Sequence, residues 1–363
     1  MKVGIVGGGN IGIALYLELK KRCMQVEIYS SKKFDGKYTL YEDSIYQFES
    51  TVCVVNSLYD LCQKCEILLI TYPPSLFKSL FNELNQYIEN KILVFVPGIG
   101  GVEYIFKPLL NKKCDIIGLQ RVPAVYRLKM QESHINGRRK QLHVAFLSNS
   151  VCNNVEIIKE IFNMECVVVP NYMNVTLTPS NPILHTSRLY ALFSKYSKND
   201  IYSKNPLFYG MWDDYSSQIL IKCDAELFAL IEKIPLDLSG VISLKTHYES
   251  NTASGLTSKM CSIKSLHNIS SPMVPVDGGY IVDWDSRYFT SDFPDGLVII
   301  KSIALLFNVS TPTIDEIIFW YQKMIDKQYL IDSKSFGKDI HDCNIPQNNG
   351  IKKIDDLINL YNN

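Results

Sequence analysis

Short runs of apolar residues alternate with longer amphipathic segments through the first half of the chain. The runs predict buried strands at residues 2–6, 26–30, 67–71, 92–96, 115–119, 143–147 and 167–169. The segments between them include residues 10–22, whose apolar side chains recur on one side as in a helix. Strands that alternate with helices are joined by crossovers, so this half predicts an α/β domain with parallel strands.

The pattern changes after Pro170, where alternating strands give way to longer helical stretches such as residues 215–233 and 296–307. A further helix is predicted to begin with Thr311 as its N-cap and Pro312 at the first helical position. The pair Asn181-Pro182 predicts an extended or turn conformation at the entrance of this region. The second half is therefore expected to be mainly helical.

The first predicted strand runs directly into the segment GGGNIG at residues 7–12, which has the G-x-G-x-x-G spacing of a dinucleotide site. Gly7 permits a tight turn, Gly9 lets the backbone approach a pyrophosphate, and Gly12 lets helix and strand pack closely. Asn10 and Ile11 open the helix, whose free N–H groups and positive end favour phosphates. The flanking strand and helix favour nucleotide binding over a glycine turn that only closes a strand–helix unit.

The end of the second strand indicates which dinucleotide binds. NAD sites usually have Asp or Glu here, whereas this chain has Ser30, Ser31, Lys32 and Lys33. Two hydroxyls and two ammonium groups suit a 2′-phosphate, which a carboxylate would repel. The sequence thus favours NADP over NAD, and the alternative is that the lysines are only solvated loop residues.

Pro73 and Gly98 follow two later strands. Ligands of such sheets bind beyond the carboxyl ends of the strands, so we expect both residues to border the cofactor as well as to end strands. A chain of 363 residues is too long for one ordinary core. We therefore predict a Rossmann-type dinucleotide-binding domain at residues 1–172 and a mainly α-helical catalytic or substrate domain at residues 173–363.

Composition excludes several classes of function. Lys plus Arg equals Asp plus Glu at 37 each, which argues against nucleic acid or an acidic membrane as partner. No apolar run approaches the roughly 20 residues that span a bilayer, and a strand at the N-terminus leaves no room for a cleavable signal. We expect a cytoplasmic protein.

Cysteine and histidine patterns give no sign of a metal. Cys62 and Cys65 form a lone C-x-x-C, which is better explained as two buried, reduced thiols than as half of a zinc site. The six histidines show no zinc-protease pattern, so no metal is predicted. The basic run at residues 138–140 is expected to be a solvated hairpin without chemistry.

Two polar segments of the second half hold candidate catalytic groups. One is residues 181–185, which end at His185, and the other is residues 287–297, which include Arg287 and Asp292. The residue types alone favour structural roles, with His185 as an ordinary core histidine and Arg287 and Asp292 as a structural ion pair.

These segments resemble the octopine/opine dehydrogenase family, and the resemblance extends over nearly the whole chain. NPILH at 181–185 resembles the catalytic-histidine segment of that family, and LFYG at 207–210 lies where the family has an aromatic pair. RYFTSDFPDGL at 287–297 resembles its arginine-to-aspartate segment, and STPTID at 310–315 matches its helix start. The chain departs from the family at Thr186, usually proline, and at Ser291, often an acid.

The resemblance implies an oxidoreductase that condenses an amino acid with a 2-oxo acid and reduces the resulting imine to a secondary amine. It makes His185 the general acid/base, a role that suits an imidazole near neutral pH. It makes Asp292 the group that orients His185, and Arg287 the group that binds a substrate carboxylate. Asn181 and Arg127 are further substrate-binding candidates, although Arg127 also fits a surface arginine or a cofactor contact.

Two other functions stay open on the sequence alone. A simple 2-oxo acid or sugar-phosphate dehydrogenase would share the glycine motif but typically relies on a lysine. A non-catalytic NAD(P)-binding redox sensor would keep the glycines without needing His185. The sequence does not decide which amino acid and which oxo acid react, or whether the chain is a monomer or a homodimer.

Overall fold

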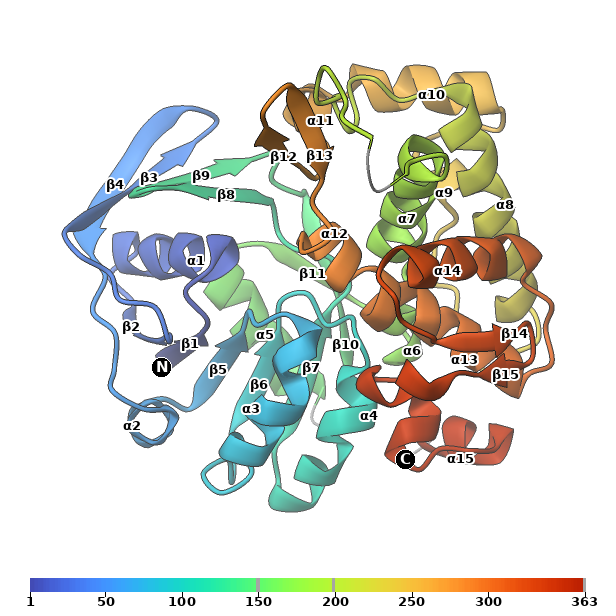
Figure 1. Ribbon diagram of the computed structural model, residues 1–363. Coiled ribbons are helices and arrows are strands. Elements are labelled where there is room, and N and C mark those ends of the chain that lie inside the picture. Colours follow the sequence, from blue (N-terminus) through green and yellow to red (C-terminus); the bar gives the residue numbers. More distant parts are fainter. Residues whose placement is uncertain (148–150, 198–199, 362–363) are drawn as a thin grey trace. The chain divides into compact units, whose positions relative to one another are not determined.

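The protein is described here by a computed structural model, which covers residues 1–147, 151–197 and 200–361 (Figure 1). The chain divides into two compact units. One is Met1–Thr176, and the other begins at Leu177 and contains the rest of the described chain. Within the described residues, every helix is too short or too polar to cross a membrane.

The first unit is built on a seven-stranded sheet in the order β11-β10-β7-β6-β5-β1-β2. Its strands are β1 (Lys2–Val6), β2 (Gln25–Tyr29), β5 (Ile67–Ile70), β6 (Ile92–Phe95), β7 (Asp115–Leu119), β10 (Gln141–Phe146) and β11 (Glu165–Val168). Within this sheet, the neighbouring strands β7, β6, β5, β1 and β2 are all parallel. The predicted Rossmann-type domain is confirmed, and each predicted strand ends within two residues of its observed bounds.

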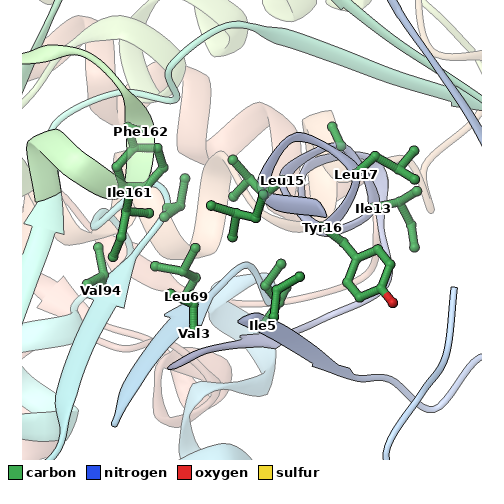
Figure 2. Packing of buried hydrophobic residues seen from close by; sticks show 14 of the residues in the cluster. Val3, Ile5, Ile13, Leu15, Tyr16, Leu17, Leu69, Val94, Ile161 and Phe162 are labelled. Carbon is green, nitrogen blue, oxygen red and sulfur yellow. The ribbon is translucent and has the colours of Figure 1, made fainter. Parts of the chain in front are cut away.

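Helices accompany this sheet as the crossover pattern predicts. They are α1 (Asn10–Lys21), α2 (Leu58–Lys64), α3 (Phe77–Leu84), α4 (Val102–Phe106), α5 (Val151–Phe162) and α6 (Met173–Thr176), with 3-10 turns η1 (Pro74–Leu76) and η2 (Lys107–Lys112). Figure 2 shows how the core forms where α1 crosses the strands, with Leu15 facing Val3, Ile5 and Leu69. Burying each such side chain stabilises the unit by about 1.5–3 kcal/mol. This packing fixes the glycine turn between β1 and α1.

Two strands depart from the parallel sheet that the sequence predicted. β10 pairs antiparallel with β7, so that Ala145 lies opposite Gly118, and β11, which is parallel to β10, runs in the same reversed direction. A parallel pair needs a long crossover connection, usually a helix. The chain between β7 and β10 instead forms a hairpin of β8 (Val125–Lys129) and β9 (Glu132–Asn136), and it re-enters the sheet in the opposite direction.

A second sheet of the first unit was not predicted. It has the order β4-β3-β9-β8, where β3 (Lys37–Glu42) and β4 (Ile45–Thr51) form a hairpin and β3 runs parallel to β9. Arg138, which follows β9, binds Glu18 of α1 at 2.5 Å and Glu42 of β3 at 2.6 Å. These carboxylates outweigh the effect of burial and raise the pKa of Arg138. The expected solvated hairpin is therefore wrong for Arg138, because two acidic side chains enclose it.

The second unit is mainly helical, as predicted. Its helices are α7 (Ser180–Phe193), α8 (Asp214–Ile231), α9 (Leu244–His247), α10 (Ala253–Ser262), α11 (Lys264–His267), α12 (Arg287–Thr290), α13 (Val298–Leu306), α14 (Pro312–Met324) and α15 (Ile354–Asn359). A π-helical turn η3 (Phe293–Leu297), 3-10 turns η4 (Lys338–Asp342) and η5 (Pro346–Asn349), and hairpins β12 (Met273–Val276)–β13 (Gly279–Val282) and β14 (Leu330–Asp332)–β15 (Ser335–Phe336) complete it. Helix α7 packs against α8, α14 and η3.

Two local predictions for this unit need correction. Helix α14 begins at Pro312 with Thr311 at the N-cap position, as predicted, but the hydroxyl of Thr311 donates to Asp315 and accepts no N–H group of the helix. The carboxylate of Glu226 on α8 accepts the N–H groups of residues 313 and 314 instead. The pair at residues 181–182 is helical and not extended, because a proline in the first turn removes no helical hydrogen bond.

Candidate active site

His185 lies in the second turn of α7, and both of its ring nitrogens are engaged. Nδ1 is 2.7 Å from Oδ2 of Asp292, and Nε2 is 2.8 Å from the hydroxyl oxygen of Tyr209. The side chains of His185 and Asp292 are only 14% and 11% exposed. Because a carboxylate accepts hydrogen bonds, it favours the tautomer with a proton on Nδ1, which leaves Nε2 to accept the Tyr209 hydroxyl proton.

Asp292 reaches the imidazole because of the unusual turn that it begins. The N–H of Leu297 donates to the carbonyl of Asp292, five residues back, so η3 is a wide π turn. A Cβ atom on Gly296 would lie 2.9 Å from the ring of Pro182, so this glycine lets η3 approach the first turn of α7. Single π turns of this kind often occur at functional sites.

The segment that carries Tyr209 is held by a buried arginine, which the sequence analysis did not identify. Arg188 is 1% exposed, and its guanidinium donates to the carbonyls of Phe208 and Met211, one on each side of Tyr209. It also donates to the hydroxyl of Ser216 at 2.8 Å. In the sequence, Arg188 lies three residues after His185 and directly before the apolar run LYALF at residues 189–193, a pattern that does not reveal its partners.

Two aromatic rings pack on the imidazole. The ring centroid of Tyr288 lies 4.7 Å from that of His185, and the ring of Phe208 lies at 5.6 Å. Arg287 directly precedes Tyr288 and is exposed. Among the described residues, the side chain of Arg287 has no hydrogen-bond or ion-pair partner, so its guanidinium is available to an anionic ligand.

The structure separates the remaining substrate candidates. Asn181 is one turn before His185 on the same helix and is half-buried, so both side chains project from one face of α7. Arg127 belongs to the first unit, on β8, where its guanidinium donates to the carbonyl of the adjacent Tyr126. The second unit therefore holds His185, Asp292, Arg287 and Asn181 without Arg127.

The glycine turn of the first unit has the geometry of a diphosphate site. Gly7 has φ of +121°, and a Cβ on Gly12 would lie 1.8 Å from the carbonyl oxygen of Gly7, so neither position tolerates a side chain. At Gly9 the situation is the reverse, because no protein atom lies within 4 Å of such a Cβ. No side chain caps α1, so its first N–H groups, including those of Asn10 and Ile11, remain open to an anion. These features fit an NAD(P) diphosphate.

The residues expected near the 2′ position follow β2 directly. Ser30 accepts the N–H of Lys32 through its hydroxyl at 3.1 Å. Ser31, Lys32 and Lys33 are exposed, and neither ammonium group pairs with a carboxylate among the described residues. The two positive charges are thus uncompensated locally.

Pro73 and Gly98 each lie three residues beyond the end of a strand, β5 and β6, on the same edge of the sheet as the glycine turn. A Cβ on Gly98 would lie 2.5 Å from the backbone of Gly118 and 2.7 Å from the hydroxyl of Tyr172. The protein's own packing therefore already explains this glycine. Within the described part of the chain, no three His, Cys, Asp or Glu side chains are grouped to hold a metal ion.

Comparison with known proteins matches each unit to a family of oxidoreductases. Residues 168–325 match the family profile "NAD/NADP octopine/nopaline dehydrogenase, alpha-helical domain", and residues 2–96 match "NADP oxidoreductase coenzyme F420-dependent". The chain is similar to an opine dehydrogenase of Haliotis discus hannai, with 26% identity over 332 residues, which cover 85% of this chain and 81% of that protein.

Solved structures show the same fold. An octopine dehydrogenase structure with NADH and L-arginine superimposes with a TM-score of 0.84 at 20% identity, covering 98% of this chain and 97% of that one. A yersinopine dehydrogenase structure with bound NADP+ gives a TM-score of 0.65 at 10% identity, covering 90% and 91%.

Proposed function

Since this chain belongs to the octopine/opine dehydrogenase family, with an N-terminal NAD(P)-binding domain and a helical opine dehydrogenase domain, we propose that it joins an amino acid to a 2-oxo acid with NADPH as reductant. We assign residues 1–172 to the dinucleotide and residues 173–363 to substrate and catalysis. One observation supports the proposal above all others. An imidazole hydrogen-bonded to a largely buried carboxylate is the proton-transfer group that this reaction requires.

The proposed reaction consumes one amine, one oxo acid, NADPH and one proton, and it releases water, NADP+ and a secondary amine. The amine nitrogen adds to the carbonyl carbon to give a carbinolamine, which loses water to form an iminium ion. When bound, NADPH supplies the hydride that reduces this ion. The remaining requirement is a group that delivers a proton to the oxygen that leaves as water.

His185 is the proposed source of that proton. Asp292 keeps the ring in one orientation through Nδ1 and stabilises the imidazolium form by its charge. Arg287, with its guanidinium free of protein partners in the described chain, would bind the carboxylate of a substrate through two parallel hydrogen bonds. Asn181, one turn before His185, would contact the same substrate through its amide.

The NADPH preference rests on the lysines after β2. The octopine dehydrogenase structure contains NADH and the yersinopine dehydrogenase structure contains NADP+, so members of this fold class use both. Ser30→Asp with Lys32→Ala should raise the Kd for NADPH by about 10–150-fold, the equivalent of one charge-assisted hydrogen bond of about 1.5–3 kcal/mol. Lys37→Ala is the control, because this neighbouring lysine pairs with Glu49. An unchanged NADPH-to-NADH ratio would reject the assignment.

The reaction is tested by following NADPH oxidation with a matrix of amino acids and 2-oxo acids. Turnover should need both substrates together, and His185→Asn should lower kcat by about 10²–10⁴-fold while NADPH still binds. His267→Asn, which removes an exposed histidine of the same unit, should leave kcat unchanged. Full activity with the oxo acid alone would instead identify a simple dehydrogenase, and tight NADPH binding without any turnover would identify a sensor.

A further inference from the structure

The hydrogen bonds of His185 leave no ring nitrogen for the substrate. Asp292 occupies Nδ1 and Tyr209 occupies Nε2, at 2.7 and 2.8 Å. We propose that Tyr209 is a catalytic residue, and that its hydroxyl transfers the proton between His185 and the substrate oxygen. Asp292, His185 and Tyr209 would then form one proton relay. This inference rests on the proposed function of the same site and adds a residue to it.

The geometry of the three groups suits a relay. Asp292 and Tyr209 bind opposite nitrogens of one ring, so a proton that arrives on one side of the imidazole can leave from the other. All three side chains are largely buried. Water therefore has little access to Nε2, and the Tyr209 hydroxyl is the group in place to accept its proton.

The alternative is that the substrate displaces Tyr209 and contacts Nε2 directly. The buried Arg188 argues against this, because it binds the carbonyls on both sides of Tyr209 and fixes the segment to α7. Trp212 stacks on Tyr209 with ring centroids 6.3 Å apart, and its indole N–H donates to Ser217 at 3.0 Å. Moving Tyr209 would disturb this packing, whereas a relay leaves it intact.

The proton balance of the proposed step closes over one turnover. The C–O bond of the carbinolamine breaks, its electron pair leaves with the oxygen, and the nitrogen lone pair forms the C=N bond. The leaving oxygen takes the hydroxyl proton of Tyr209 and departs as water. Tyr209 regains a proton from Nε2 of the His185 imidazolium, which becomes neutral. The other ring proton stays on Nδ1, where it is hydrogen-bonded to Asp292. After the product leaves, a proton from solvent returns through the Tyr209 hydroxyl to Nε2 of His185, which accounts for the one proton that the reaction consumes.

The test compares Tyr209→Phe with the matched control Tyr190→Phe. Both remove a tyrosine hydroxyl from the same unit, but that of Tyr190 binds Glu316 and lies outside the site. Tyr209→Phe should lower the single-turnover rate of the imine-forming and reduction sequence by about 100-fold, the lower end expected for a lost proton-transfer group. Its Kd for NADPH should stay at the wild-type value, and Tyr190→Phe should keep both.

A proton inventory in H2O–D2O mixtures separates the relay from a merely structural role. The wild-type single-turnover rate should depend on deuterium fraction along a curve, because two protons move together, and Tyr209→Phe should give a straight line. A wild-type rate in Tyr209→Phe would overturn the relay, as would an unchanged curve in a slowed variant. If Tyr209→Phe unfolds more easily than Tyr190→Phe, the wild-type inventory decides alone, and a straight line there overturns the relay. A wild type that turns over without an amine overturns the proposed function itself.

Discussion

Replacing Gly9 or Gly12 by alanine should separate two different requirements of the glycine turn after β1. A Cβ on Gly12 would lie 1.8 Å from the carbonyl oxygen of Gly7, an overlap that only a backbone shift relieves. Forced overpacking of this kind typically costs about 1–3 kcal/mol, and for a unit of this size each kcal/mol lowers Tm by roughly 2–4 °C. Gly12→Ala should therefore lose roughly 2–12 °C in Tm and bind NADPH poorly.

Gly9→Ala should leave the fold intact, because no protein atom lies within 4 Å of the added Cβ. Its φ of −90° also suits alanine. The methyl group would instead enter the space where the diphosphate meets the N-terminus of α1. Loss of one charge-assisted hydrogen bond costs about 1.5–3 kcal/mol, which corresponds to a rise in Kd of about 10–150-fold.

Two measurements on each variant test this contrast. Thermal unfolding without dinucleotide reports the stability of the fold, and a fluorescence titration with NADPH reports binding. Because a bound ligand raises Tm, the two are measured separately. Tm should fall clearly for Gly12→Ala only, whereas NADPH binding should weaken in both variants. If Gly9→Ala binds NADPH like the wild type, the diphosphate does not approach this turn.

Three further predictions concern stability and thiol chemistry. Burial alone would raise the pKa of Asp213, but hydrogen bonds from its own helix and a buried guanidinium lower it below 3.8. Asp213→Asn should thus lower the free energy of unfolding by its full amount at pH 7 and by progressively less as pH falls below 3.8, which urea unfolding at a series of pH values measures. Glu226→Ala should lower the unfolding free energy by about 0.5–2 kcal/mol, as lost helix caps do; no change in urea unfolding would contradict the capping. Burial raises the pKa of Cys62 and Cys65 to about 11, so alkylation at pH 8 mapped by mass spectrometry should modify exposed Cys23 first; equal labelling would contradict it.

Local patterns predicted the first unit well where the structure depends on nearby residues. The strands of the parallel sheet and the glycine turn follow from short apolar runs and from three glycines at fixed spacing. The β8–β9 hairpin was missed because β9 pairs with β3, which is far away in sequence. The mostly polar residues of β9 also do not predict a buried strand. Arg138 was misjudged for the same reason, since its partners Glu18 and Glu42 lie 120 and 96 residues away.

The candidate active site shows a similar limit. His185 and Asp292 are 107 residues apart, so only the family resemblance related them before the structure placed them in contact. The role of Arg188 depends on backbone carbonyls, which carry no sequence signal. The turn expected at Asn181-Pro182 was wrong because the rule for residues before proline does not hold in the first turn of a helix.

The most direct test of the central claim is the fate of deuterium from NADPH that is labelled at the transferable position of the nicotinamide ring. Incubated with a productive amino acid and 2-oxo acid, the wild type should place one deuterium on the carbon next to nitrogen in a secondary amine. Mass spectrometry would detect this product, and His185→Asn should not form it at a comparable rate. Deuterium found in a 2-hydroxy acid, with no secondary amine, would contradict the account.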